Sequence, residues 1–406
     1  MPPAAALEVF VAAKPAGSLY RSDVELDEIL FEYSAHCTPQ DVVSLTMPVT
    51  RAPYDSMGSV HPIFEMNLPE GALLERLRTL FAKTVPHLDN LGLLEIVGRS
   101  QIGRLRYGAP NLSEEEIAAQ SLEELLTYKG TKDLFADLLQ RYARHSGISG
   151  MQPKVLLKAH ETAPSRITHR GATHVVKTFN PREHPELAAN EFFCMQAAHH
   201  AGIPVPAVEL SNNRRLLIIE RFDLRSDGTY LGCEDFCVLN GVRPHGRYDG
   251  SYELLARRIG QFVSPQQQRA ALEQLFLMLA LSCAIENGDA HLKNFAVVYE
   301  HADATVSLAP AYDMVSTTPY VPRDVLALTL AGSKEFPSRR RLMAFGRQSC
   351  GLTAGRVAEL LDRVGKGVRK ASAQIRRYIK QRPDFRRAGE HLIATFDRGL
   401  LRINTG

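Results

Sequence analysis

The chain has 406 residues, and its 45% hydrophobic and 23% charged residues are ordinary for a folded protein. Lysine and arginine total 48 and aspartate and glutamate total 45, so the net charge of +3 is too balanced for a general binder of nucleic acids or membranes. The longest apolar run, residues 275–285, is about half as long as a membrane-spanning helix. The first residues lack the basic start of a secretory signal, and the six cysteines are sparse, so we expect a cytoplasmic protein with free thiols.

The first third of the chain predicts a mixture of strands and helices. Residues 7–12 and 29–33 are short apolar runs typical of strands, and Gly17-Ser18 is the expected turn after the first of them. Apolar residues spaced three and four apart predict a helix over residues 71–82. Residues 113–142 begin with the form of a capping box and continue with helical spacing, which predicts further helix.

From residue 146 the pattern changes to short strands followed by longer helices. Strands are expected at residues 155–157, 174–177, 205–210 and 216–220. Helices are expected at residues 187–201, 252–260, 265–285 and 357–378. The sequence therefore predicts a small strand-rich lobe that precedes a larger helical lobe.

The clearest chemical pattern is the polar loop 287–295, which follows the long apolar helix. Asp289 lies five residues before Asn294, which is the spacing of the protein-kinase catalytic loop. In that loop the aspartate accepts the proton of an attacking hydroxyl, and the asparagine holds a metal ion. The alternative interpretation is a capped polar turn without chemistry.

A second carboxylate follows this loop at Asp313. An apolar run at residues 295–298, a polar turn at 301–303 and a short run at 306–308 predict a hairpin that returns Asp313 to Asn294. Two oxygen ligands there would suit Mg²⁺, a hard cation. The alternative is an aspartate that caps a helix or turn.

Three weaker patterns precede the loop. Lys177 ends an apolar strand, and Glu191 lies in the next helix, an order that allows an ion pair orienting nucleotide phosphates; a surface lysine and a solvated glutamate are the alternative. The glycine-containing turn at 146–154 could bring backbone N–H groups to phosphate. The segment 220–223 follows the last strand and could offer backbone atoms to an adenine edge. Together the patterns stand in the order found in kinases.

With these motifs in place, the sequence resembles the HipA-type serine/threonine protein kinases, toxins of bacterial toxin–antitoxin pairs. The matching motifs are residues 147–154, 190–191, 220–223, 234–237, 287–295 and 312–313. Residues 64–71 and 93–103 resemble the N-terminal subdomain of that family, so the likeness extends over nearly the whole chain.

The resemblance implies an α+β, protein-kinase-like two-lobed fold with an extra small mixed α/β N-terminal subdomain. Its segments would be the N-terminal subdomain (1–110), linking helices (111–145), a β-rich lobe with the glycine loop (146–222) and an all-helical C-terminal lobe (223–406).

The resemblance also implies that ATP and Mg²⁺ bind between the last two lobes. Asp289 would be the catalytic base, with Asn294 and Asp313 as the Mg²⁺ ligands, and Glu191 would be the partner of Lys177. The implied ATP-binding residues are Lys177, Gln152, Lys154, Ser149, Gly150, Glu220, Phe222, Asp223 and His291.

The same resemblance implies the biology. Family members phosphorylate aminoacyl-tRNA synthetases, notably the glutamyl enzyme, and so stop translation and cause dormancy or persistence. Their partner is a HipB-like helix-turn-helix antitoxin, and the pair represses its own operon, so operator DNA is reached mainly through the antitoxin. No membrane partner is expected.

One position departs from the family pattern. In some members a serine just before the glycine loop is autophosphorylated, and Gly147 stands at its place here. Ser149 is therefore our first candidate for self-phosphorylation, and Ser146 lies nearby.

Two other functions stay open from the sequence. One is a kinase-like small-molecule phosphotransferase, which also uses an Asp and an Asn at this spacing. The other is a non-enzymatic co-repressor that binds an antitoxin and DNA. Residues 363–387 hold ten basic residues and one acidic residue, which suits either a solvated helix face or a surface for DNA phosphates.

Overall fold

The computed structural model describes residues 6–22, 28–56, 59–81, 89–108, 119–128, 134–149, 152–160 and 172–405. The chain divides into two compact units, which are taken here one at a time. The strand-rich unit comprises Met1–Thr178, Ser211–Pro244 and Val298–Thr305, and the helical unit comprises Phe179–Leu210, His245–Val297 and Val306–Gly406. These units follow other boundaries than the four segments expected from the sequence, and the four-part division stays a prediction.

The strand-rich unit begins with an antiparallel sheet in the order β4-β3-β2-β1-β5. Its strands are β1 (Leu7–Val11), β2 (Lys14–Arg21), β3 (Ile29–Tyr33), β4 (Tyr54–Asp55) and β5 (Leu105–Gly108). The helices of this region are α1 (Pro62–Glu65), α2 (Gly71–Phe81) and α3 (Asn90–Val97). The strands expected at residues 7–12 and 29–33 and the helix expected at 71–82 are confirmed.

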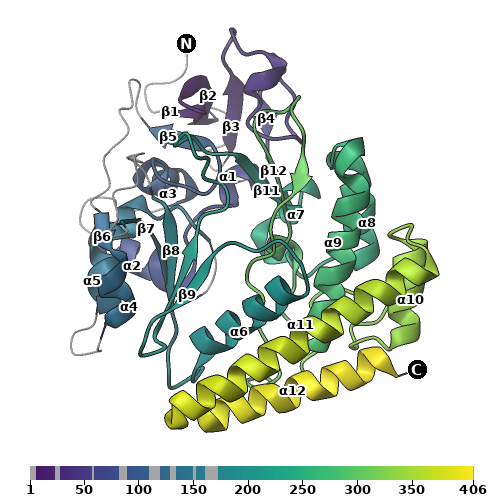
Figure 1. Ribbon diagram of the computed structural model, residues 1–406. Helices are drawn as coiled ribbons and strands as arrows, with labels where there is room; N and C mark the ends of the chain where they lie inside the picture. The colour runs from purple at the N-terminus through teal and green to yellow at the C-terminus, as the bar shows by residue number, and fades with distance from the viewer. Residues whose placement is uncertain are drawn as a thin grey trace. The chain divides into compact units, whose positions relative to one another are not determined.

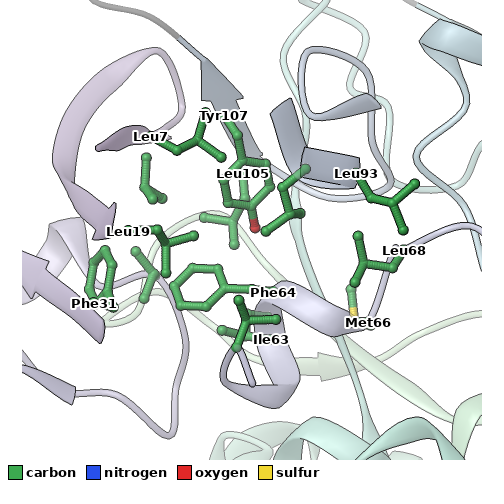
Figure 2. Close-up of a cluster of buried hydrophobic side chains, with 14 of the residues drawn as sticks. Leu7, Leu19, Phe31, Ile63, Phe64, Met66, Leu68, Leu93, Leu105 and Tyr107 are labelled. Atoms are coloured by element: carbon green, nitrogen blue, oxygen red, sulfur yellow. The ribbon is translucent and has the colours of Figure 1, made fainter. Parts of the chain in front are cut away.

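One hydrophobic core joins this sheet to its helices (Figure 2). Phe64 of α1 lies between two strand residues, with ring centroids 5.2 Å from Phe31 and 5.9 Å from Tyr107. Leu93 on α3 and Leu19 on β2 belong to the same core. Because one face of the sheet is buried in this way, the alternation of apolar residues along its strands fixes their register.

The turn expected at Gly17-Ser18 is wrong, because both residues lie within β2. The chain turns instead at Ala12 and Ala13, whose φ angles are 47° and 70°. Positive φ at both central residues is typical of the tight hairpin turns that match strand twist, but alanine gives no sequence signal for it. The glycine at position 17 serves close packing, since a Cβ there would lie 2.2 Å from the backbone oxygen of Glu32.

A second sheet of the strand-rich unit contains β6 (Ala119–Ser121), β7 (Lys154–His160), β8 (His174–Thr178) and β10 (Leu216–Glu220) in that order. β6 and β7 are parallel, and the other neighbours are antiparallel. Helices α4 (Leu122–Thr127) and α5 (Leu134–Tyr142) follow β6. Continuous helix over 113–142 is therefore wrong at residues 119–121, where pairing with β7 outweighs local propensity; residues 109–118 and 129–133 lie outside the described part.

The strand-rich unit also contains β11 (Gly232–Asp235) and α7 (Phe236–Leu239). Glu234 is fully buried there and accepts hydrogen bonds from the Ser44 hydroxyl (2.6 Å), the Leu45 amide (2.8 Å) and the Tyr299 hydroxyl. Burial raises the pKa of Glu234, although these three bonds work in the opposite direction. This buried carboxylate anchors the first sheet's loop to β11.

The helical unit consists mainly of six long helices (Figure 1). They are α6 (Leu187–His200), α8 (Tyr252–Phe262), α9 (Pro265–Ala284), α10 (Arg339–Gln348), α11 (Ala354–Gln381) and α12 (Arg386–Asn404). Short strands β9 (Val208–Leu210) and β13 (Ser307–Leu308) belong to it, and β12 (Ala296–Tyr299) begins in it. The short 3₁₀ turns in the described part of both units are Pro39–Asp41, Ala143–His145, Pro244–Gly246, Leu292–Asn294 and Pro383–Phe385.

Helix α11 runs beside α6 and α12 (Figure 1). A Cβ at Gly367 of α11 would lie 2.7 Å from the Ala197 oxygen of α6, so only glycine lets these two backbones approach so closely. The apolar run of α9 is buried from Leu275 onwards. Within the described ranges, no helix is long and apolar enough to cross a membrane. The helices expected in this unit are confirmed.

Candidate active site

The loop that contains Asp289 is shaped by the end of α9. Glu286 has a φ of 52°, which turns the chain away from the helix, and the Asn287 amide donates to the Ser282 oxygen over 2.8 Å. A Cβ at Gly288 would lie 2.1 Å from a carboxylate oxygen of Asp324, so glycine is required at this point. The loop is therefore held in one conformation by backbone geometry just before Asp289.

The side chain of Asp289 has one direct partner among the described hydrogen bonds. The Tyr248 hydroxyl donates to its Oδ1 over 2.7 Å, while the Asp289 amide donates to the Asn287 side chain over 2.9 Å. Burial raises the pKa of Asp289, the bond from Tyr248 lowers it, and the nearby charge of Asp313 raises it again. The side chain is still 47% exposed, so it can be reached from solvent.

Asn294 and Asp313 lie on two segments whose neighbouring residues contact each other. The predicted hairpin is present as β12 and β13, closed by the Ala309 amide, which donates to the Ala296 oxygen over 2.8 Å. The Tyr312 hydroxyl then donates to the Lys293 oxygen over 2.8 Å. Since Tyr312 precedes Asp313 and Lys293 precedes Asn294, this bond fixes the two expected metal ligands on adjoining segments.

This pair of residues fits a magnesium ion in chemistry. Both supply oxygen atoms, which Mg²⁺ prefers, and Asn294 is buried with its Oδ1 already oriented by the His291 amide at 3.2 Å. Asp313 has a φ of 54°, a left-handed conformation that costs an aspartate little and is common at functional sites. Within the described residues, no three His, Cys, Asp or Glu side chains group as a metal site, so the prediction depends on this amide and carboxylate.

His291 is neutral near pH 7, because burial and the charges of Arg247 and Lys293 lower its pKa to about 4. Its ring packs edge-on against Tyr248, with centroids 5.1 Å apart. The Nδ1 atom of His291 and the side-chain nitrogen of Asn287 are buried and bond to none of the described groups. Buried polar atoms of this kind usually have a partner, so both are suited to a bound ligand.

In the strand-rich unit, the predicted lysines are cross-strand neighbours. Lys177 on β8 stands directly opposite Lys154 on β7, and both residues are buried. Directly opposed residues of an antiparallel pair lie on the same face, and two like charges there repel each other. The register therefore places the two lysines that are expected to contact phosphate on one face of the sheet.

The turn before β7 separates the two serines considered for self-phosphorylation. Ser146 is fully buried, donates to the Tyr142 oxygen over 2.7 Å and accepts from the Leu156 amide over 2.9 Å. Ser149 is half-buried, as is Gln152, and Gly150 lies outside the described residues. Ser146 therefore has a structural role, whereas Ser149 can be reached.

The departure at Gly147 has a steric explanation. Its amide donates to the Ser100 oxygen over 2.8 Å, and a Cβ at this position would lie 2.8 Å from the same oxygen and 2.4 Å from the Gln101 side chain. A serine at position 147 would need the backbone or Gln101 to move.

The segment 220–223 is anchored by a buried ion pair. Arg221 donates to both carboxylate oxygens of Asp223, at 2.9 and 2.6 Å, and the Gly103 amide adds a third bond at 2.7 Å. Burial raises the pKa of Asp223, but Arg221 and the Gly103 amide outweigh it and lower the pKa overall. The Asp223 side chain is therefore used to stabilise the fold. The nucleotide contacts expected of this segment are left to its backbone, including that of Glu220 and Phe222.

One expectation and one omission complete the site. Glu191 is buried on α6 of the helical unit, while Lys177 belongs to the strand-rich unit, and their pairing stays a prediction. Tyr248 was not expected from the sequence, because it lies 41 residues before Asp289 in a segment with no periodic pattern. Only the fold reveals that it contacts the carboxylate.

Comparison with known proteins places these residues in a family. Residues 146–372 match the HipA-like C-terminal domain, and residues 7–108 match the HipA N-terminal domain. A chain in the Shewanella oneidensis complex of HipA, HipB and operator DNA is 19% identical, with a TM-score of 0.70 over 98% of this chain and 97% of that one. That likeness confirms the expected α+β, two-lobed kinase-like fold.

Two Sinorhizobium fredii proteins are similar in sequence. The chain is 32% identical to "Putative kinase Y4dM" over 41% of its own length and 42% of that protein. It is 27% identical to "Putative kinase Y4mE" over 68% of its length and 69% of that protein. Because the C-terminal domain match alone covers more than half of the sequence, the chain belongs to the HipA family.

Proposed function

We propose that this protein is an ATP- and Mg²⁺-dependent serine/threonine protein kinase and the toxin of a toxin–antitoxin pair. The observation that carries the proposal is the arrangement of the Asp289 loop: a partly exposed carboxylate oriented by Tyr248, beside the oxygen donors Asn294 and Asp313. The names of the similar Sinorhizobium proteins support kinase activity.

The residues divide the work of phosphoryl transfer. Asp289 accepts the proton of the acceptor hydroxyl, and Tyr248 keeps its carboxylate in the orientation required for this. Asn294 and Asp313 would hold the Mg²⁺. When bound, Mg·ATP supplies the phosphoryl group and the positive charge that neutralises its oxygens.

Most of the proposed nucleotide contacts belong to the strand-rich unit. Lys177 would contact phosphate oxygens, with Gln152 and Lys154 on the flap above them. Ser149 and Gly150 of the glycine loop are further proposed contacts. The backbone of Glu220, Phe222 and Asp223 would contact the adenine edge. Neutral His291, from the helical unit, would contact the phosphates. The opposed register of the two lysines supports their part, because it places both on one face of the sheet.

The surface around Asp289 favours a polypeptide acceptor over a sugar or drug. Tyr248, Val321 and Val325 are 41%, 52% and 41% exposed, and they are three of the five large apolar side chains exposed in the described part of the chain. Val325 lies beside the catalytic loop, since its backbone oxygen is 2.5 Å from a Cβ built on Gly288. A small polar substrate would leave these side chains in water, whereas a protein segment would cover them.

We further propose an aminoacyl-tRNA synthetase as the substrate, the glutamyl enzyme first, because known members of the family act on it. A HipB-like antitoxin is the proposed partner, supported by the similar chain that was solved with HipB and DNA. Operator DNA is then contacted mainly through the antitoxin. The basic segment 363–387 suits a solvated face, and Arg363 within it already donates to the backbone oxygens of Ala201 and Gly202.

The test is ATP-dependent labelling of purified proteins. Wild-type protein should transfer phosphate to glutamyl-tRNA synthetase, and Asp289→Asn should not. Asp362→Asn, a change of the same chemistry at an exposed position of α11, is the matched control and should behave as wild type. Labelling of a small hydroxyl compound but of no protein would favour the small-molecule alternative.

A further inference from the structure

Glu286 is a buried carboxylate three residues before the proposed catalytic base. Its side chain is 4% exposed and receives hydrogen bonds from Arg402 (2.8 Å), Arg398 (2.9 Å) and Thr318 (2.8 Å). Burial raises the pKa of Glu286, but the three bonds outweigh it and lower the pKa overall, so the group is ionised near neutral pH. A buried carboxylate with this many donors is held in one place.

The backbone of Glu286 connects the two halves of the site. Its carbonyl oxygen accepts the Thr317 amide over 3.1 Å, and the Thr317 hydroxyl accepts the Gly288 amide over 2.8 Å. Thr317 lies four residues after the proposed metal ligand Asp313, and Gly288 directly precedes Asp289. Displacement of Glu286 would therefore move the segments of the base and of the metal ligand together.

Both arginines come from the last helix, far along the chain. Arg398 and Arg402 lie one turn apart on α12, and they are 112 and 116 residues from Glu286. Arg402 also lies 5.3 Å from the ring centroid of Phe336, which restricts its side chain. A Cβ at Gly399, between the two arginines, would be 2.2 Å from the Ala284 oxygen, so α12 touches the end of α9 directly.

The conformation of Glu286 is a second, independent sign that its side chain matters. A φ of 52° favours glycine or asparagine at the end of a helix, and glutamate there is strained. The contacts of the carboxylate with α12 compensate for that strain. A shorter or uncharged residue would lose the compensation and free the loop to relax.

We infer that Glu286 is a positioning residue through which helix α12 holds Asp289 and the segment of Asp313 in register for phosphoryl transfer. This inference rests on the proposed function of Asp289 and deepens it. Changes at α12 should then alter turnover although no residue of α12 touches the reacting atoms. Affinity for ATP should change less than turnover, because two of the proposed phosphate contacts, Lys154 and Lys177, belong to the other unit.

The test compares four variants of the full chain in steady-state kinetics. Glu286→Gln should lower kcat by about a hundredfold and Arg402→Ala by about tenfold, with KM for ATP within about threefold of wild type, because small displacements of a catalytic group are costly. Arg402→Lys, which keeps the charge, should recover part of the loss. Arg387→Ala, the control at an exposed arginine of α12, should match wild type.

A purely structural role would lower the melting temperature but leave kcat per folded molecule unchanged, and that result in Glu286→Gln would overturn the inference. If Glu286→Gln does not fold, Arg402→Lys and Arg402→Ala carry the same comparison.

Hydrogen exchange separates this inference from the proposed function. The amides of Gly288 and Thr317 should exchange about tenfold faster in Arg402→Ala than in Arg387→Ala, because they lose the arrangement that protects them. If wild-type protein transfers no phosphate, the proposed function fails, and the exchange rates alone decide the coupling. Unchanged protection of both amides in Arg402→Ala would contradict the inference whatever the activity.

Discussion

The hydroxyl of Tyr248 donates to the carboxylate of Asp289 over 2.7 Å, in a loop where burial and Asp313 both raise the pKa of that carboxylate. The bond favours the ionised form, which is the form that can accept a proton. It also leaves one carboxylate oxygen for the acceptor hydroxyl. Tyr248 thus fixes both the charge and the orientation of the proposed base.

Replacing Tyr248 with phenylalanine should move the acid limb of the pH–rate profile. The carboxylate loses a donor that lowers its pKa, so the pKa of Asp289 rises and the base becomes protonated at higher pH. We therefore expect the fall in kcat/KM on acidification to begin at higher pH in Tyr248→Phe, with partial activity kept at alkaline pH. The measurement is kcat/KM against pH for both proteins.

His291 should not contribute to the shift of the acid limb. Its pKa of about 4 keeps it neutral at the pH values, above that, at which the profile is measured. An acid limb that stays in place in Tyr248→Phe would mean that another group governs the profile.

Asp289→Asn should stabilise the fold at neutral pH while it removes activity. A carboxyl whose pKa is raised in the folded state binds more protons there than in the unfolded state, so stability falls as pH rises through the raised pKa and stays lower above it. Asparagine cannot ionise and escapes this penalty. The melting temperature of Asp289→Asn should exceed that of wild type at pH 8, and the difference should shrink on acidification.

The control for this stability measurement is Asp362→Asn on the exposed face of α11, which should show no such difference. A variant Asp289→Asn that melts below wild type at pH 8 would argue that the carboxylate stabilises the loop instead.

Asp313→Asn should weaken the binding of the Mg²⁺ ion on which activity depends. An amide in place of the carboxylate removes one negative charge from the two-residue oxygen site, and Mg²⁺ binds carboxylates more strongly than amides. We expect a half-saturating Mg²⁺ concentration at least about tenfold above that of wild type and a lower kcat, measured by Mg²⁺ titration of phosphotransfer. Identical titration curves would remove Asp313 from the metal site.

Replacing Ser149 or Ser146 with alanine should distinguish a phosphorylation site from a structural residue at the turn before β7. If the protein labels itself, Ser149→Ala should remove the phosphate found by fragment mass mapping. Ser146→Ala should keep the phosphate but lower the free energy of unfolding by about 1–3 kcal/mol, since it leaves the buried Leu156 amide without its acceptor. Phosphate mapped to Ser146 would contradict its structural role.

The parts of the candidate site that depend on residues close together in the chain could be predicted from the sequence. The spacing of Asp289 and Asn294 and the hairpin that leads to Asp313 depend on neighbouring residues, so a pattern of a few positions could predict them. The register that opposes Lys177 and Lys154 comes from the antiparallel pairing of β7 with β8.

The contacts that support the site join distant segments and left no pattern in the sequence. Tyr248 meets Asp289 from 41 residues away, and Arg402 meets Glu286 from 116 residues away. Such pairs depend on how whole helices pack, which no local spacing encodes. In the same way, the Ala12-Ala13 turn has residues that rarely adopt positive φ, and the surrounding sheet imposes it.

The measurement that tests the central claim most directly is the intact mass of purified glutamyl-tRNA synthetase after incubation with ATP, Mg²⁺ and this protein. The account predicts a gain of one phosphoryl group with the wild type and with Asp362→Asn, and none with Asp289→Asn, because the proton of the acceptor hydroxyl has no base to receive it. An equal gain with Asp289→Asn would contradict the role of Asp289 and with it the proposed mechanism.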